Sequence, residues 1–135
     1  MKEPMYKIEH VAITVFDLEK SVEFYEINFG FQEVKRFDKP NLKLRAVLLQ
    51  LGDFPLEIIQ PYSTETSMII EEKSDLAKIL HEEGINHLAF SVNDINASYD
   101  RLKENKVKLV TEIIEGRCFF CRDNDGVLIE VKRTA

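Results

Sequence analysis

Apolar and polar residues alternate along two short segments of the chain, and the two segments resemble each other. Residues 8–15 place Val11, Ile13 and Val15 on one side and His10, Ala12 and Thr14 on the other. Residues 87–92 repeat the pattern, with Leu88, Phe90 and Val92 opposite His87, Ala89 and Ser91. A period of two predicts β-strands with one bulky apolar face. In both segments the histidine shares its face with small side chains, which leave room for a ligand.

A helix is predicted after each of these strands. Asp17 and Asp94 stand where an N-cap residue accepts hydrogen bonds from the first helical turn. Apolar residues then recur three or four positions apart, and Gly30 can end the first helix in the left-handed conformation. These stripes consist of Leu18, Val22, Tyr25 and Phe29 in the first helix, and of Ile95, Tyr99 and Leu102 in the second. We expect both helices to cover the bulky face of a sheet.

Three further strands are predicted in each half, separated by turn residues. They span residues 31–37, 42–51 and 55–60, and then residues 107–114, 118–122 and 127–132. Each half therefore has the order β-α-β-β-β, which predicts an α+β fold. The 135 residues suit one domain, with module one at about 6–60, a connector at 61–84 carrying a short helix at 75–83, and module two at about 85–133.

Composition and charge narrow the classes of partner. The chain is 44% hydrophobic and 31% charged, which is typical of a globular protein. A net charge of −6, without a stripe of basic and aromatic residues, argues against nucleic acid and anionic membranes. No apolar run approaches the roughly 20 residues of a membrane span. We therefore expect a cytoplasmic protein with a small-molecule partner.

Cys118 and Cys121 form a C-x-x-C pair that is open to two interpretations. It is compatible with a redox pair or half a zinc site. Positions three apart on a strand point to opposite faces, however, and no second cysteine pair accompanies them. Two reduced structural cysteines in a reducing compartment are the better interpretation.

The last predicted strand of each half carries an acid inside an apolar stretch. Glu57 lies in Leu-Glu-Ile-Ile, and Glu130 lies in Leu-Ile-Glu-Val. A carboxylate between large aliphatic residues must be exposed, paired or bound to a cation, because isolated burial costs several kcal/mol. Alone, each acid and each histidine has a structural alternative. Their equivalent places in a duplicated module favour a metal site made of His10, Glu57, His87 and Glu130.

The stretches I-E-H-V-A-I-T-V and D-N-D-G-V-L-I-E-V resemble the vicinal oxygen chelate superfamily, which includes glyoxalase I, methylmalonyl-CoA epimerase, extradiol dioxygenases and fosfomycin- and bleomycin-resistance proteins. The resemblance implies two modules that curl into a cup-shaped mixed sheet with the helices outside. It also implies that the first and last strands of each module supply ligands to one divalent ion. Zinc, nickel, cobalt, manganese and iron are all candidates, since ligand type alone does not choose among them.

Such a site predicts proton transfer next to a carbonyl group. The metal would polarise the carbonyl, and Glu130 or Glu57 would act as the catalytic base. Returning the proton to the next carbon is a glyoxalase-type isomerisation, and returning it to the opposite face is an epimerisation. The family further implies a homodimer, with the site inside one chain or shared between two.

Several alternatives remain open. Local features resemble the epimerases, but residues 115–117 replace a longer stretch, and the glycine-rich segment of glyoxalases is missing, so neither coenzyme A nor glutathione is assigned. Lys35 and Arg36 fall near a family arginine, and solvated cations are an equally good interpretation. An extradiol dioxygenase needs another pocket histidine, for which only His81 remains. A small-molecule-binding protein of the antibiotic-resistance kind, without turnover, is the alternative of a different class.

Overall fold

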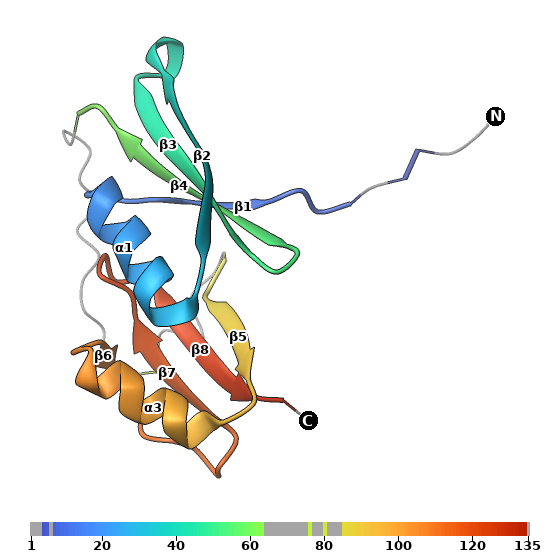
Figure 1. Ribbon diagram of the computed structural model, residues 1–135, viewed down its shortest axis with the longest axis vertical. Coiled ribbons are helices and arrows are strands. Elements are labelled where there is room, and N and C mark those ends of the chain that lie inside the picture. Colours follow the sequence, from blue (N-terminus) through green and yellow to red (C-terminus); the bar gives the residue numbers. More distant parts are fainter. Residues whose placement is uncertain (1–3, 6, 64–75, 77–79, 81–84, 135) are drawn as a thin grey trace. The chain divides into compact units, whose positions relative to one another are not determined.

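The computed structural model describes residues 4–5, 7–63, 76, 80 and 85–134, and the chain divides into two units. Unit one is Met1–Ser67 and unit two is Met68–Ala135. Each unit has its own four-stranded sheet (Figure 1).

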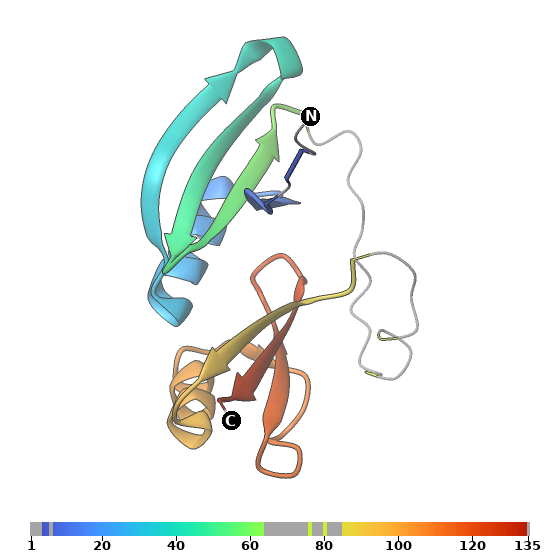
Figure 2. The same ribbon diagram turned by 90° about the vertical axis from the view of Figure 1, so that its right-hand side faces the viewer.

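Unit one has the predicted β-α-β-β-β order with one short 3₁₀ helix added. Its elements are β1 (Val11–Thr14), α1 (Leu18–Phe29), β2 (Gln32–Lys39), η1 (Pro40–Leu42), β3 (Leu44–Leu51) and β4 (Phe54–Pro61). The strand order in the sheet is β1-β4-β3-β2. The first strand runs parallel to the last one, and the other neighbours are antiparallel. Figure 2 shows β2, β3 and β4 as the long strands of this sheet.

Unit two repeats this topology. Its elements are β5 (Leu88–Val92), α3 (Ile95–Glu104), β6 (Lys108–Leu109), β7 (Cys118–Arg122) and β8 (Leu128–Arg133), in the sheet order β5-β8-β7-β6. Here too the first strand is parallel to the last. The α+β fold and the duplicated module are confirmed. The cup that would unite the two modules stays a prediction.

The helix caps form as the sequence predicts. The Asp17 carboxylate accepts a hydrogen bond from the Lys20 amide at 3.1 Å, and the Asp94 carboxylate accepts one from the Ala97 amide at 3.0 Å. Gly30 ends α1 with a φ of 81°, a conformation that a side chain would disfavour. Both strand-to-helix corners are therefore held by the chain's own polar groups.

Each helix buries its apolar stripe against its own sheet. In unit one, α1 packs on β3 and β4, and Tyr25 is fully buried with its ring edge-on to Phe31 at 5.6 Å. In unit two, Tyr99 of α3 meets Phe119 of β7 edge-on at 5.2 Å. Aromatic pairs in this geometry add to the stabilisation that burial gives. Among the described residues, α1 and α3 each lie on one face of their sheet, and the histidine–glutamate pairs lie on the other.

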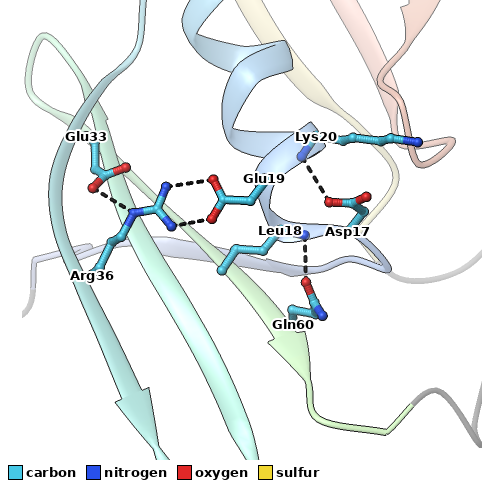
Figure 3. A network of polar contacts seen from close by, with 7 residues as sticks. All are labelled: Asp17, Leu18, Glu19, Lys20, Glu33, Arg36 and Gln60. Atoms are coloured by element: carbon cyan, nitrogen blue, oxygen red, sulfur yellow. Dashed lines mark hydrogen bonds and ion pairs between the residues drawn. The ribbon is translucent and has the colours of Figure 1, made fainter.

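An ion-pair network ties α1 to β2 (Figure 3). Arg36 forms a bidentate pair with Glu19, with one contact at 3.0 Å, and donates a further bond to Glu33 at 2.9 Å. The hydrogen bonds from Arg36 hold the pKa of Glu19 below its usual value. A cavity of about 290 Å³ adjoins this network, lined by Leu18, Glu19, Arg36, Phe37, Asp38, Arg45, Ala46 and Val47.

Two predicted strands are shorter in the structure than expected. The predicted strand 107–114 is wrong in its extent, because β6 has two residues and only an isolated bridge joins Ile114 to Cys118. The amides of Val110 and Thr111 both donate to the Phe120 carbonyl, while the Thr111 hydroxyl takes the bond from the Phe120 amide. A side chain thus replaces the backbone acceptor, and the ladder stops.

The predicted strand 8–15 is confirmed only for Val11–Thr14. Val11 pairs with Leu56 in a parallel register, so His10 would pair with Pro55. Proline has no N–H to donate, and the strand therefore begins at Val11. The predicted connector helix 75–83 lies outside the described residues except for Leu76 and Leu80, and Leu76 packs beside Phe120 and Leu128. Among the helices of the described residues, none is both long and apolar enough to cross a membrane.

We predict that Asp94→Ala lowers the free energy of unfolding by about 1 kcal/mol, because the Ala97 amide loses its acceptor. Urea denaturation followed by circular dichroism measures the change. Asp100→Ala, which removes the same charge from an exposed position inside α3, is the matched control and should cost much less. Equal losses for both variants would show that the charge, and not the cap, carries the effect.

Candidate functional site

The two predicted histidine–glutamate pairs occupy equivalent positions in the two units. In unit one, Ala12 of β1, which comes two residues after His10, lies opposite Glu57 of β4. In unit two, Ala89 of β5, which comes two residues after His87, lies opposite Glu130 of β8. Residues two apart on a strand share a face, so each histidine lies diagonally across from its glutamate. The strand register is therefore the same in both halves.

This register brings the side chains of each pair into contact. Nε2 of His10 lies 3.1 Å from Oε2 of Glu57, and Nε2 of His87 lies 3.4 Å from Oε1 of Glu130. The two glutamates are 14% and 20% exposed, and the two histidines are 36% and 25% exposed. Each unit thus presents one imidazole nitrogen and one carboxylate oxygen to the same point, within reach of solvent.

The residue before each histidine holds the other ring nitrogen. Nδ1 of His10 lies 3.1 Å from the Glu9 carboxylate, and Nδ1 of His87 lies 2.8 Å from the Asn86 side-chain oxygen. A partner on one nitrogen fixes the tautomer and orientation of the ring and leaves the other nitrogen to bind. In both units the nitrogen left over is Nε2, the one that faces the glutamate.

Two more side chains of unit two lie beside this pair. The Phe120 ring meets the His87 ring edge-on at 5.6 Å. Phe120 lies directly across from Glu130, and Cys118 lies two residues earlier on the same face. Burial, and then the neighbouring Glu130 charge, raise the pKa of the Cys118 thiol.

Each pair can share a proton or provide two donors to a cation. Among the residues that the structure describes, no group of three or more His, Cys, Asp or Glu side chains is arranged to hold a metal ion. Each unit by itself therefore contributes two donors, and a site with four protein donors needs both pairs.

The remaining sequence-predicted residues lie in different places. Arg36 pairs across the sheet with Val47, on the face that α1 covers, so it does not share the face of Glu57. Lys35 does lie on that face, beyond Leu48, with its ammonium 5.5 Å from the centre of the Phe37 ring. The prediction for His81 falls outside the described residues.

The cysteines are both free thiols, and they point to opposite faces as predicted. Cys118 lies on the face of Glu130, whereas Cys121 lies opposite Ile129 and is fully buried. The sequence analysis missed the positions of Cys118 and Phe120 and the contacts of Glu9 and Asn86. A polar residue directly before each histidine is a signal that the repeat could have revealed, while the first two positions depend on the register between β7 and β8.

Comparison with known families gives one match that spans most of the chain. The family described as "Glyoxalase/Bleomycin resistance protein/Dioxygenase superfamily" matches residues 7–131. That range includes all four residues of the two histidine–glutamate pairs.

Three relatives are 19–28% identical to this chain over the regions compared. Human mitochondrial methylmalonyl-CoA epimerase is 28% identical over 94% of this chain and 73% of its own length. The trypanothione-dependent glyoxalase I of Leishmania major is similar in structure, with a TM-score of 0.75 and 25% identity over 96% of this chain and 87% of that one. A fosfomycin resistance protein from Listeria monocytogenes, solved with Mn(II), has the same fold at a TM-score of 0.69 and 19% identity, over 98% of this chain and 95% of that one. The relatives' names cover different activities, so they indicate the family and not the substrate.

We predict that Cys121 resists alkylation in the folded protein. Burial, and then the Asp123 charge, raise the pKa of its thiol to about 12. At pH 8 the thiolate fraction is then on the order of 10⁻⁴, against roughly a quarter for an unperturbed thiol. Iodoacetamide labelling followed by peptide mass spectrometry should show Cys121 reacting far more slowly in native protein than in guanidinium, and more slowly than the half-buried Cys118. Equal native and unfolded rates would contradict the assignment.

Proposed function

The chain belongs to the glyoxalase/bleomycin resistance protein/dioxygenase superfamily, and we propose that it is a metal-dependent lyase or isomerase. In this proposal it moves a proton next to a carbonyl group of a small metabolite, as a glyoxalase or an epimerase does. The observation that carries the proposal is the matched pair of histidine–glutamate contacts at one strand register in both units.

The distances within the pairs suit two donors of one ion. Metal–nitrogen and metal–oxygen bonds of about 2.1 Å at right angles place the donor atoms about 3.0 Å apart, and a tetrahedral angle places them about 3.4 Å apart. The His10–Glu57 and His87–Glu130 separations are 3.1 Å and 3.4 Å. Imidazole and carboxylate together suit zinc, nickel, cobalt, manganese or iron. We infer that His10, Glu57, His87 and Glu130 together hold one such ion.

The residues of the site would divide the work of the reaction. A bound divalent ion supplies Lewis-acid polarisation of the carbonyl and stabilises the charge that develops as the adjacent C–H bond breaks. Glu130 or Glu57 takes up the proton and returns it. Glu9 and Asn86 orient the histidines. We further propose a cytoplasmic homodimer with a small-molecule substrate.

We predict that Glu130→Gln and Glu57→Gln differ in their effect on proton exchange. The variant that replaces the catalytic base should lose most of the proton-exchange activity, because the amide of glutamine does not accept the proton. The measurement is deuterium incorporation from D₂O into 2-oxo compounds, hemithioacetals and acyl-CoA esters, with bound metal quantified for each variant. Exchange confined to acyl thioesters identifies an epimerase, and hemithioacetal turnover identifies a glyoxalase.

Two outcomes of the same measurement would argue against an enzyme. Wild-type protein without bound metal and without exchange would overturn the proposal. Ligand binding without turnover would instead favour the small-molecule-binding protein. A matched control is Glu112→Gln, an exposed acid of unit two away from the pair, which should keep wild-type exchange.

We predict that both pairs contribute to one ion. The double variants His10→Ala/Glu57→Gln and His87→Ala/Glu130→Gln should each lose nearly all bound metal, because two donors bind far more weakly than four. If each pair held its own ion, each double variant would retain half of the metal. Plasma emission spectroscopy of the purified variants distinguishes these outcomes.

Co-expression of the two double variants then locates the site. If one site combines His10–Glu57 of one protomer with His87–Glu130 of its partner, a mixed dimer regains one intact site, and metal and exchange return. If all four residues come from one chain, every site in the mixture lacks one pair, and neither bound metal nor proton exchange returns.

A further inference from the structure

The two units keep the same histidine–glutamate geometry but differ in the next row of residues on that face. In unit one this row runs across the strands as Thr14, Ile59 and Ala46. In unit two the equivalent row is Ser91, Lys132 and Cys118. Lys132 and Cys118 of unit two thus occupy the positions that Ile59 and Ala46 occupy in unit one. Only the second copy places a cation beside its glutamate on the same strand.

Lys132 shares the face of Glu130 because it follows that residue by two positions on β8. Two residues along a strand span about 7 Å, a distance that the flexible lysine stem can close. Lys132 lies directly across from Cys118 of β7, and the charges of Lys132 and Glu130 both act on the Cys118 thiol. None of the ion pairs in the described part of the chain involves the Lys132 ammonium. The ammonium is exposed and able to meet a ligand at this face.

The cations of unit one on the equivalent face are placed differently. Lys35 and Lys39 both stand on β2, at 5.5 Å and 4.9 Å from the centre of the Phe37 ring. Cation–π contacts of this kind stabilise an ammonium without a counter-ion. Lys35 is also separated from Glu57 by a whole strand, β3. Lys132 therefore shares a strand with the glutamate of its pair, whereas β4, the strand of Glu57, carries no lysine.

We propose that Lys132, with the Ser91 hydroxyl beside it, receives a carboxylate group of the substrate and so sets the specificity of the site. This inference rests on the proposed function and narrows its substrate to a small carbonyl compound that carries a free carboxylate. A carboxylate brought next to Glu130 meets like-charge repulsion, and the Lys132 ammonium offsets it. The row of unit two then binds the charged end of the substrate, while the row of unit one has a hydroxyl at Thr14 but no cation to do so.

The test measures carboxylate binding by titration calorimetry on the full chain as purified, with malonate as the probe and its neutral diamide, malonamide, for comparison. Lys132→Gln should weaken malonate binding by about fivefold, the scale of one solvent-exposed ion pair, and leave malonamide unchanged. Lys132→Arg should bind malonate as wild type does. Arg133→Gln is the matched control, because it removes the same charge from the neighbouring exposed position on the other face of β8.

Several outcomes would overturn the inference. Unchanged malonate affinity in Lys132→Gln would do so, as would a loss of malonate affinity in Lys35→Gln alone. An equal loss of malonate affinity in Arg133→Gln would reveal a general charge effect. The inference and the proposed function fail separately. Deuterium exchange that persists in Lys132→Gln with an unchanged KM would reject the role of Lys132 and leave the reaction intact. Malonate binding that depends on Lys132 in a protein without metal or exchange would reject the reaction and keep the carboxylate site.

Discussion

Parallel pairing between the first and last strand of each unit sets the position of every residue of the candidate site. The pairing places Ala12 opposite Glu57 and Ala89 opposite Glu130, so that each histidine lies diagonally across from its acid. Because side chains alternate, a slip of one residue would turn Glu57 into the helix-covered face and bring Ile58 out of it. Burying that carboxylate without a partner would cost several kcal/mol. The apolar face thus enforces the register on which the polar face depends.

The corners at both ends of the first strand reinforce this arrangement. At one end, Glu9 or Asn86 holds Nδ1 of the following histidine. At the other end, an aspartate caps the helix, and in unit one the Gln60 side chain also accepts a bond from the Leu18 amide at 2.7 Å. These bonds fix a short strand that backbone pairing alone would hold over only four residues in unit one. The side chains of the site therefore stand on a rigid frame, as a binding site requires.

Duplication explains both the symmetry and the differences of the two units. The parts of the module that maintain the fold recur: the capping aspartates, the apolar stripes and the parallel strand pair. The parts that face away from the helix, beyond the histidine and glutamate, have diverged: Ile59 and Ala46 in one unit stand where Lys132 and Cys118 stand in the other. Side chains on this face are not required for packing beneath the helix, so they are free to be replaced according to what the protein binds.

Local patterns in the sequence determined the β-α-β-β-β order, the helix caps, the opposite orientations of Cys118 and Cys121 and the equivalence of the two histidine–glutamate pairs. These features depend on periodicity and on neighbours a few residues apart, and both can be recognised in the sequence without knowledge of tertiary contacts. Only the tertiary structure decided that Phe120 contacts the second pair and Cys118 shares its face, that Arg36 joins α1 to β2, and that Thr111 ends β6 early. Each of these depends on the register between strands or on the packing of a helix over a sheet, and hydrogen bonds between distant segments set both.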